Sequence, residues 1–516
     1  MRQLLQTHWP AILTIVIALV IGLDIYQDFG VSIDETSQRE IGLAAYNYAR
    51  GYFPGNYHDF TLRDHGPGFE WIYLFFEKLL NLTKMRDIFL SRHLITYLFF
   101  VLTTSTIYLW IYRVFASRWL AALGLAALLF HPVIFGHAFF NPKDVPAMCI
   151  FLVSMVSMQW AFSSNKMLPY LILGLICGYS TTFRLLNIII LLPIGLFFII
   201  DLFAAFRNGN AQRVVIAGLL VLAGTCITLY TFWPTLWEDP IAGMKYIYET
   251  NSKYPWDGIL QFGGMQIRST NLPWSYIPTW FFITTPEMIL LSGIIGATYL
   301  LVRVIDEPAQ YCQNTPKRSI LLAFICFLVP IVVVVCKDAV LYDGWRHMYF
   351  IYPGFVMLAV FGFSELLKNR SKLILWSLCI LQFIFIARFM IKNHPFEHVY
   401  FNSFVSHEED YLMNNYELDY WGTSHKLGLE WLAQYDRRYG IKLYEDMWTI
   451  RDNHSFLNVA LHPKFVFTKD INEAEYHLQF FRTHPYWFPN EEVPAENIIY
   501  EKRVSGSPIY RIVKLR

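Results

Sequence analysis

Long apolar runs with almost no ionisable residues limit what this chain can fold into. Eleven of them are candidates to cross the roughly 30 Å hydrocarbon core of a bilayer as helices. Only 16% of the 516 residues are charged, whereas about 25% is usual in soluble proteins. The sequence therefore predicts a polytopic α-helical membrane protein with about eleven transmembrane helices. The runs begin near Trp9, Arg92, Trp119, Val145, Leu168, Leu186, Val214, Phe281, Ser319, His347 and Leu373.

The overall charge and the cysteines narrow the class further. With 41 Lys and Arg against 40 Asp and Glu, the formal net charge is +1, which argues against a nucleic-acid-binding protein. Six of the seven cysteines lie in or beside apolar runs, which predicts small buried side chains rather than disulfides. The first run follows Arg2 and has no small-residue cleavage site after it, so we expect a retained anchor.

Basic residues fix the predicted orientation of the helices. If the N-terminus is cytoplasmic, every short inner connection carries Lys or Arg, as the positive-inside rule requires. The outer face then receives the loops 27–91, 138–144, 233–280 and 337–346 and everything after Lys392. We therefore expect the functional residues on this face, which would be the periplasmic or extracellular side of a bacterial plasma (inner) membrane.

The chain is predicted to contain two domains. Residues 1–391 form the transmembrane domain, and residues 392–516 form a small extracytoplasmic α/β domain. Alternating patterns predict strands at 464–468, 498–504 and 508–514, and Gly506-Ser507 fits the turn between the last two. Thr423 or Ser424 is expected to cap a helix that ends at Gly440.

The distribution of charged residues points to the first outer loop. The apolar runs nearly lack charges between their ends, which argues against an ion-coupled transporter or a proton pump. Two segments of the loop concern function, Ser32-Ile33-Asp34-Glu35-Thr36 and Arg63-Asp64-His65-Gly66-Pro67. Taken alone, Asp34 and Glu35 are also explained as caps of the helix that follows. The loop holds nine acidic residues: Asp28, Asp34, Glu35, Glu40, Asp59, Asp64, Glu70, Glu77 and Asp87.

Several short segments, in their order and on one face, resemble the GT-C class of lipid-linked sugar transferases. The Asp34-Glu35 pair and the later His65-Gly66-Pro67 are similar to the first loop of the protein O-mannosyltransferases, which have His-Pro-Pro there. Aminoarabinose transferases that modify lipid A have Glu-Lys-Pro-Pro, which would align with Asp64-His65-Gly66-Pro67. The resemblance is to bacterial members and covers roughly residues 9 to 425. Further similar segments are Asn141-Pro142-Lys143-Asp144, Thr182-Phe183-Arg184, Asp343 to Tyr349, Val399 to Asn402 and Asp419 to Gly422.

This resemblance implies a membrane glycosyltransferase with the GT-C fold. It would transfer a sugar from a polyprenyl-phosphate-linked donor to an extracytoplasmic protein, lipid or glycan in a single displacement. Such a reaction needs a base for the acceptor and cations on the departing phosphate. Asp34 is the candidate base, Asp144 is a second carboxylate that orients the acceptor or the sugar, and Glu35 is the alternative for either role.

Arg184, Arg346 and His65 are the candidates for binding the donor phosphate, since guanidinium groups match phosphate oxygens. Each candidate has a structural alternative. The arginines could anchor helix ends at the interface, and His65 could stabilise a turn. Asp144 could cap a helix or pair with the adjacent Lys143.

Cofactors and competing functions complete the predictions. The sequence identifies no cofactor, and the lipid-phosphate sugar is the donor substrate. A divalent metal stays open, with Asp64 and His65 as candidate ligands. The alternatives are a transporter or flippase of lipid-linked glycans and an oligosaccharide ligase or polymerase. For a transferase, we expect Asp34 and Asp144 on one outer cavity, within about 10 Å of each other. That cavity should open to the bilayer, with Arg184 or Arg346 at its mouth.

Overall fold

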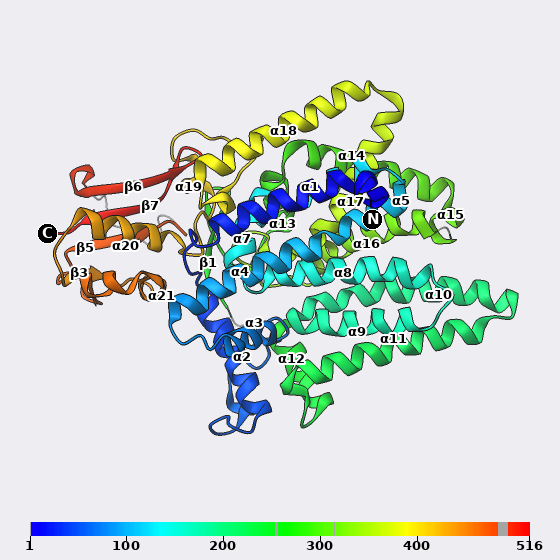
Figure 1. The fold of residues 1–516 in the computed structure, drawn as a ribbon, viewed down its shortest axis with the longest axis horizontal. Coiled ribbons are helices and arrows are strands. Elements are labelled where there is room, and N and C mark those ends of the chain that lie inside the picture. Colours follow the sequence, from blue (N-terminus) through cyan, green and yellow to red (C-terminus); the bar gives the residue numbers. More distant parts are fainter. Residues whose placement is uncertain (1, 253–255, 314, 483–493) are drawn as a thin grey trace.

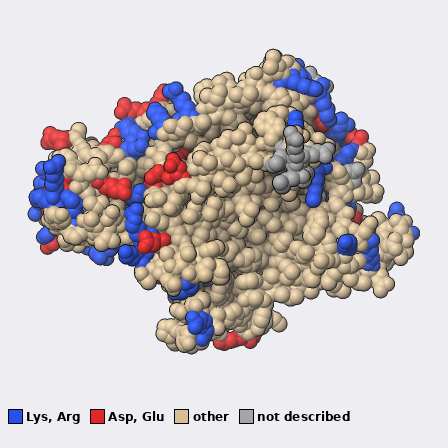
Figure 2. All heavy atoms as spheres, in the orientation of Figure 1, with Lys and Arg blue, Asp and Glu red and all other residues tan. Residues whose placement is uncertain are grey.

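The computed structural model describes residues 2–252, 256–313, 315–482 and 494–516. The chain is mostly helical, and a small domain with a β-sheet lies at one end of a long helical body (Figure 1). On the face drawn in Figure 2, charged side chains gather over the small domain and the opposite helix ends. The middle of that face carries few charges, as expected of a surface in contact with lipid.

Nine helices in the described residues are long and apolar enough to cross a membrane. They run nearly parallel to the long axis of the molecule (Figure 1). Several consist of two consecutive elements, such as α4 with α5. Their elements are α1 (Arg2–Ile25), α4 (Met85–Thr104), α5 (Thr106–Phe115), α8 (Asp144–Phe162), the 3-10 helix Leu185–Ile190 with α10 (Leu191–Asn208), α11 (Ala211–Phe232), α14 (Glu287–Asp306), α16 (Thr315–Cys336), the 3-10 helix Arg346–Ile351 with α17 (Tyr352–Asn369), and α18 (Lys372–Asn393).

The other two predicted segments are helical but are not straight, full-length spans. The run near Trp119 forms α6 (Arg118–Leu129) and α7 (Pro132–Phe140), which are bent by 57° because Pro132 cannot continue the preceding helix. The run near Leu168 forms α9 (Leu168–Phe183), which has only 16 residues. The described chain therefore has nine spans, or ten if the bent pair counts as one, instead of about eleven.

One predicted helix start is wrong. The run expected to begin near Phe281 is divided, because Pro286 separates the short α13 (Tyr276–Thr284) from α14. The outer loops also contain elements that the apolar pattern does not predict. These are α2 (Glu35–Ala49), the 3-10 helix Tyr57–Asp59, α3 (Glu70–Leu79), the 3-10 helix Pro234–Leu236, α12 (Pro240–Ser252), β1 (Ile259–Phe262) and β2 (Met265–Arg268); α15 (Pro308–Gln313) lies between α14 and α16.

The small domain is an α/β domain with a five-stranded mixed sheet in the order β4-β3-β5-β7-β6. β3 pairs in parallel with β4 and β5, whereas β7 is antiparallel to β5 and β6. The predicted turn lies one residue earlier, because Ser505 and Gly506 adopt the positive φ angles and Ser507 already belongs to β7. The elements are α19 (Tyr411–Asn415), α20 (Ser424–Tyr435), β3 (Ile441–Tyr444), α21 (Thr449–Phe456), β4 (Phe465–Thr468), β5 (Tyr476–Phe480), β6 (Ile498–Val504) and β7 (Ser507–Lys514), with 3-10 helices at Glu397–Val399, Val459–Lys464 and Ala495–Asn497.

The small domain forms hydrogen bonds with the backbone immediately before Asp34. The buried Asn453 side chain of α21 accepts a hydrogen bond from the Val31 amide at 2.9 Å and donates one to the Val31 carbonyl at 2.9 Å. The Ile33 amide donates to the Trp421 carbonyl at 3.0 Å. A side chain at Gly30 would collide with the Thr423 carbonyl. These contacts fix where the first outer loop begins.

Asn453→Ala should destabilise the protein by about 1–3 kcal/mol, because the buried amide of Val31 loses its acceptor. Thermal unfolding in detergent measures this loss. Asn458→Ala is the matched control, since Asn458 caps an exposed turn whose amide water can reach. Equal melting temperatures for the two variants would contradict the structural role of Asn453.

Candidate functional site

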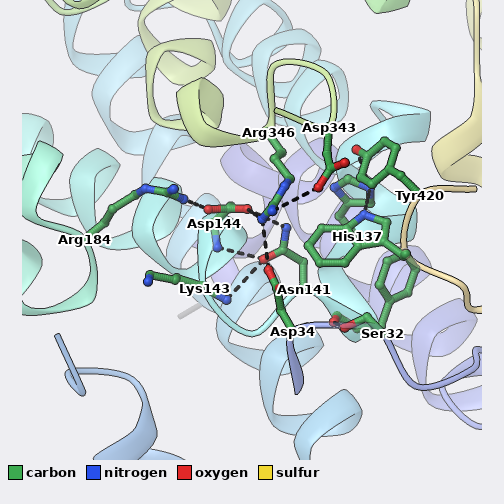
Figure 3. Close-up of polar contacts among 12 residues, drawn as sticks. Ser32, Asp34, His137, Asn141, Lys143, Asp144, Arg184, Asp343, Arg346 and Tyr420 are labelled. Carbon is green, nitrogen blue, oxygen red and sulfur yellow. Dashed lines mark hydrogen bonds and ion pairs between the residues drawn. The ribbon is translucent and has the colours of Figure 1, made fainter. Parts of the chain in front are cut away.

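The Arg346 guanidinium lies at the centre of a cluster of buried charges. Its Nη1 is 3.0 Å from Asp34 Oδ2 and 3.0 Å from Asp144 Oδ2, and its Nη2 is 3.2 Å from Asp343 Oδ2. Figure 3 shows these three carboxylates around Arg346, with Arg184 on the far side of Asp144. The carboxylates come from three separate segments, immediately before α2, at the start of α8 and before the 3-10 helix Arg346–Ile351, so one cation joins segments that are distant in the sequence.

A backbone turn and two aromatic rings hold the Arg346 side chain against these partners. Asp343 and Gly344 both have positive φ angles, 58° and 69°. The resulting turn brings the Asp343 carboxylate back to the Arg346 guanidinium. The guanidinium lies over the rings of Tyr342 at 4.9 Å and Trp421 at 4.6 Å. Arg346 is therefore held by ion pairs and by cation–π contacts.

Asp144 is the first residue of α8 and lies between two guanidinium groups. Its second oxygen pairs with Arg184, and Asn141 donates to Oδ2 at 3.1 Å. The Asn141 side chain also accepts hydrogen bonds from the amides of Lys143 and Asp144, so Asn141 acts as the cap. The salt bridge that Asp144 could have formed with Lys143 is replaced by the pairs with Arg184 and Arg346.

Asp34 and Glu35 have different environments. Asp34 precedes α2 but makes no side-chain capping bond, and its side chain is 30% exposed, against 1% for Asp144 and 2% for Asp343. Glu35 is buried, accepts a hydrogen bond from the Ser32 amide at 2.8 Å and lies 3.1 Å from His93 Nε2. Asp34 is thus the accessible carboxylate, and Glu35 is immobilised.

A cavity of about 1190 Å³ lies beside the charged cluster. Its polar end is formed by Asp64, His65, Lys143, Arg184 and His347. Its apolar walls come from Leu185, Leu186 and Ile188, the C-terminal ends of α11 and α16, and α12. Arg184 and His65 thus line the cavity, whereas Arg346 does not. Asp34 and Asp144 share one nitrogen of Arg346 and so lie well within the expected distance, but neither lines this cavity, which Asp144 meets through Arg184.

Two basic side chains, Lys143 and Arg184, lie at the polar end of the cavity together with one acid, Asp64. Burial, and then the nearby Arg184, lowers the pKa of the Lys143 ammonium to about 7, and Lys143 forms no side-chain ion pair within the described residues. Burial, and then Lys143, lowers the pKa of His65, which keeps the ring neutral. Burial alone would raise the pKa of Asp64, but the hydrogen bond from His65 and the charge of Lys143 lower it overall.

The residues present do not fit a divalent cation. The described residues contain no group of three or more His, Cys, Asp or Glu side chains placed to bind a metal. Asp64 and His65 bind each other at 3.0 Å, close to the cationic Arg184 and Lys143. Arg346 itself occupies the position between Asp34 and Asp144. We therefore derive no step through a metal.

Three charged residues escaped the sequence predictions as functional residues. Lys143 appeared only as a partner for Asp144, and Asp343 only as part of a similar segment. Arg482, two residues after the end of β5, pairs with Asp343 Oδ1 at 2.8 Å. No local pattern marks Arg482, because its partner lies more than a hundred residues earlier in the chain.

Comparisons with known proteins bear on the fold. No family model and no curated protein matches the sequence. The crystal structure of the Archaeoglobus fulgidus oligosaccharyltransferase in its apo form matches with a TM-score of 0.51 and 10% identity, over 91% of this chain and 69% of that chain. The same archaeal enzyme, AglB, in complex with an inhibitory peptide and a dolichol-phosphate, matches with a TM-score of 0.47 and 11% identity, over 92% and 70%. The chain is thus a polytopic membrane protein with the GT-C fold of an oligosaccharyltransferase.

Arg346→Met should destabilise the protein by about 3–5 kcal/mol, because it leaves buried carboxylates without their shared cation. Uncompensated carboxylates have raised pKa values in the folded state, so the stability of this variant should recover as the pH falls and decrease as it rises. Thermal unfolding at several pH values measures both effects.

Arg318→Met is the control for Arg346→Met. Arg318 pairs with a single, partly exposed carboxylate, Asp201, and its loss should cost less. A melting temperature and pH dependence shared by the two variants would contradict the central role of Arg346.

Proposed function

We propose that this chain is a membrane glycosyltransferase that moves a sugar from a polyprenyl-phosphate-linked donor to an acceptor on the outer side of the membrane. The cavity of about 1190 Å³, with apolar walls and with Lys143 and Arg184 at its polar end, carries the proposal. A lipid-linked phosphate has an apolar tail and a charged phosphate, which match the apolar walls and the basic side chains of the cavity. The tail would stay against the walls, since exposing it to water would cost about 25 cal/mol per Å² of apolar surface. The location in a bacterial inner membrane, with the site facing the periplasm, belongs to the same proposal.

Lys143 and Arg184 are assigned to the donor phosphate. The half-buried Lys143 forms no side-chain ion pair in the described part of the chain, and a phosphate oxygen would provide a partner. Arg184 lines the cavity and pairs with Asp144, so it connects the phosphate to the carboxylates. A neutral His65 that donates its Nδ1 proton to Asp64 is a poor donor to phosphate, so we place it beside the phosphate rather than on it.

Asp34 is assigned as the general base. Of the three carboxylates on Arg346 it is the most exposed, and an acceptor hydroxyl or amine needs direct access to the base. Asp144 is assigned to orienting the acceptor or the sugar together with Arg184. Arg346 is assigned to holding these carboxylates rather than to the phosphate, since three carboxylates already surround its guanidinium.

The reaction follows from these positions as a single displacement. The acceptor oxygen or nitrogen forms a bond to the anomeric carbon while its proton passes to Asp34. The bond between the anomeric carbon and the phosphate oxygen breaks, and its electron pair stays on that oxygen. The phosphate gains one negative charge as it leaves, and Lys143 and Arg184 stabilise this charge.

Radiolabelled sugar donors test the proposal. Membranes that contain or lack the protein are incubated with single sugars on polyprenyl phosphate, with oligosaccharides on polyprenyl diphosphate and with nucleotide sugars. Label is then measured in the protein, lipid and glycan fractions. We expect transfer from a polyprenyl-phosphate sugar. Transfer from the diphosphate-linked oligosaccharide alone would favour a ligase, and movement of intact donor across the membrane without transfer would favour a flippase.

Asp34→Asn should lower transfer by roughly 10²- to 10⁴-fold, because the amide cannot take the acceptor proton. Donor binding should change little, since the phosphate is assigned to Lys143 and Arg184 and not to Asp34. The exposed Asp59→Asn, in the same loop, is the matched control and should keep its activity. Activity of Asp34→Asn within threefold of the wild type would contradict the assignment.

Donor affinity should depend on pH through Lys143. The free ammonium has a pKa of about 7, and a bound phosphodiester, which keeps one negative charge across this range, would raise it. Affinity should therefore be highest below pH 7 and fall by up to about tenfold per pH unit above it. Binding of a polyprenyl-phosphate sugar to the protein in nanodiscs, without acceptor, measures this dependence.

Lys143→Met should bind the donor weakly, with little change between pH 7 and 9. Lys469→Met, at an exposed position of the small domain, should behave as the wild type does. A wild-type slope that persists in Lys143→Met would assign the titration to another group and contradict the role of Lys143.

A further inference from the structure

We propose that Arg482 of the small domain is a positioning residue for the transfer reaction, and that it acts on Asp34 through Asp343 and Arg346. The proposal rests on the function proposed above. It gives the small domain a part in the reaction.

The first observation is an unbroken series of ion pairs with alternating charge. Arg184 pairs with Asp144, Asp144 with Arg346, Arg346 with Asp343, and Asp343 with Arg482. One end of the series lies in the donor cavity, and the other end belongs to the small domain. Asp34 joins at Arg346, in the middle of the series.

The second observation is an excess of acid around Arg482. Glu417 is buried, and neither of its carboxylate oxygens has a hydrogen-bond partner in the described structure. Burial, and then the neighbouring Asp343, raises the pKa of Glu417 well above its ordinary value. Arg482 is the cation that pairs with Asp343 and lies near Glu417, and its own side chain is only 10% exposed.

A third observation connects Arg482 to the donor cavity through aromatic rings. The Arg482 guanidinium lies 5.5 Å from the ring centre of Trp256. Trp256 packs against Tyr342 at 4.3 Å, and Tyr342 lines the cavity and covers Arg346. Arg482 therefore contacts both the ionic and the aromatic surroundings of Arg346.

Removing the charge of Arg482 should change how the Arg346 guanidinium divides its contacts between Asp343 and Asp34. Asp343 would then depend on Arg346 alone and draw the guanidinium away from Asp34. Asp34 would lose its orientation and part of the positive charge beside it, so transfer should slow and its acidic limb should move to higher pH. The charged and titratable groups around Asp34 and Asp343, besides Arg482, are Arg346, Asp144, Lys143, Glu417, Tyr276 and Tyr420.

Steady-state transfer over a range of pH tests the proposal. R482Q should lower kcat by about 10- to 100-fold, leave KM for the donor within threefold and move the acidic limb up by about half to one pH unit. Adding D343N to R482Q removes the acid that Arg482 offsets, so the double variant should recover to near the activity of D343N alone. R438Q is the control, because Arg438 pairs with Asp436 and Glu475 on the exposed side of the same domain.

The outcomes separate a positioning role from a structural one. Wild-type kcat and pH profile in R482Q would overturn the proposal. A loss without a pH shift and without recovery in the double variant would also overturn it, because it would show only that Arg482 supports the fold.

A measurement without turnover separates this proposal from the proposed function. In D34C, the rate at which the thiol is alkylated reports its thiolate fraction, which Arg346 should raise. Mass spectrometry follows the modification at this site over pH, with and without R482Q. A shift of this profile to higher pH in R482Q supports the ionic path even if no sugar transfer is found. An unchanged profile contradicts the path even if transfer is confirmed.

Discussion

The shared guanidinium of Arg346 is the interaction on which the outer part of this molecule depends. Two of its three carboxylate partners, Asp144 and Asp343, are removed from water, and each would be strongly unfavourable there without a cation. Since Asp34, Asp144 and Asp343 come from separate loops, satisfying this one cation sets the position of all three. The contacts of Asn453 with Val31 hold the first of these loops from the other side.

The position of the charged cluster beside the cavity determines which part of the proposed donor would face the carboxylates. Arg184 belongs to both, because it lines the cavity and pairs with Asp144. A donor whose phosphate meets Lys143 and Arg184 would keep its tail against the apolar ends of α11 and α16. Its anomeric carbon would then face the carboxylates. Charge develops on the phosphate during the reaction, so fixed cations at that end favour the transition state.

The sequence predicted those features that local patterns encode. Apolar runs located every membrane helix, but they do not reveal bends, so Pro132 and Pro286 changed the number and the limits of the spans. Motif order on one face of the membrane singled out Asp34, Asp144, Arg184 and Arg346, which the structure brings together. Their roles in catalysis remain predictions.

Long-range contacts explain what the sequence did not predict. The pairing of Asp343 with Arg482 links two domains and leaves no spacing to recognise. Whether Lys143 forms an ion pair depends on which side chains fold around it, and the sequence does not show these neighbours. The separation of Asp34 from Glu35 into an accessible and an immobilised carboxylate depends on His93 and Ser32. Such distinctions arise from packing rather than from residue order.

An experimental structure with a bound polyprenyl-phosphate sugar would test the central claim most directly. The account predicts the phosphate between Lys143 and Arg184, the lipid tail along the outer ends of α11 and α16, and the sugar extending toward Asp34. A phosphate bound elsewhere, with Lys143 still without a counter-ion and the cavity open, would contradict it.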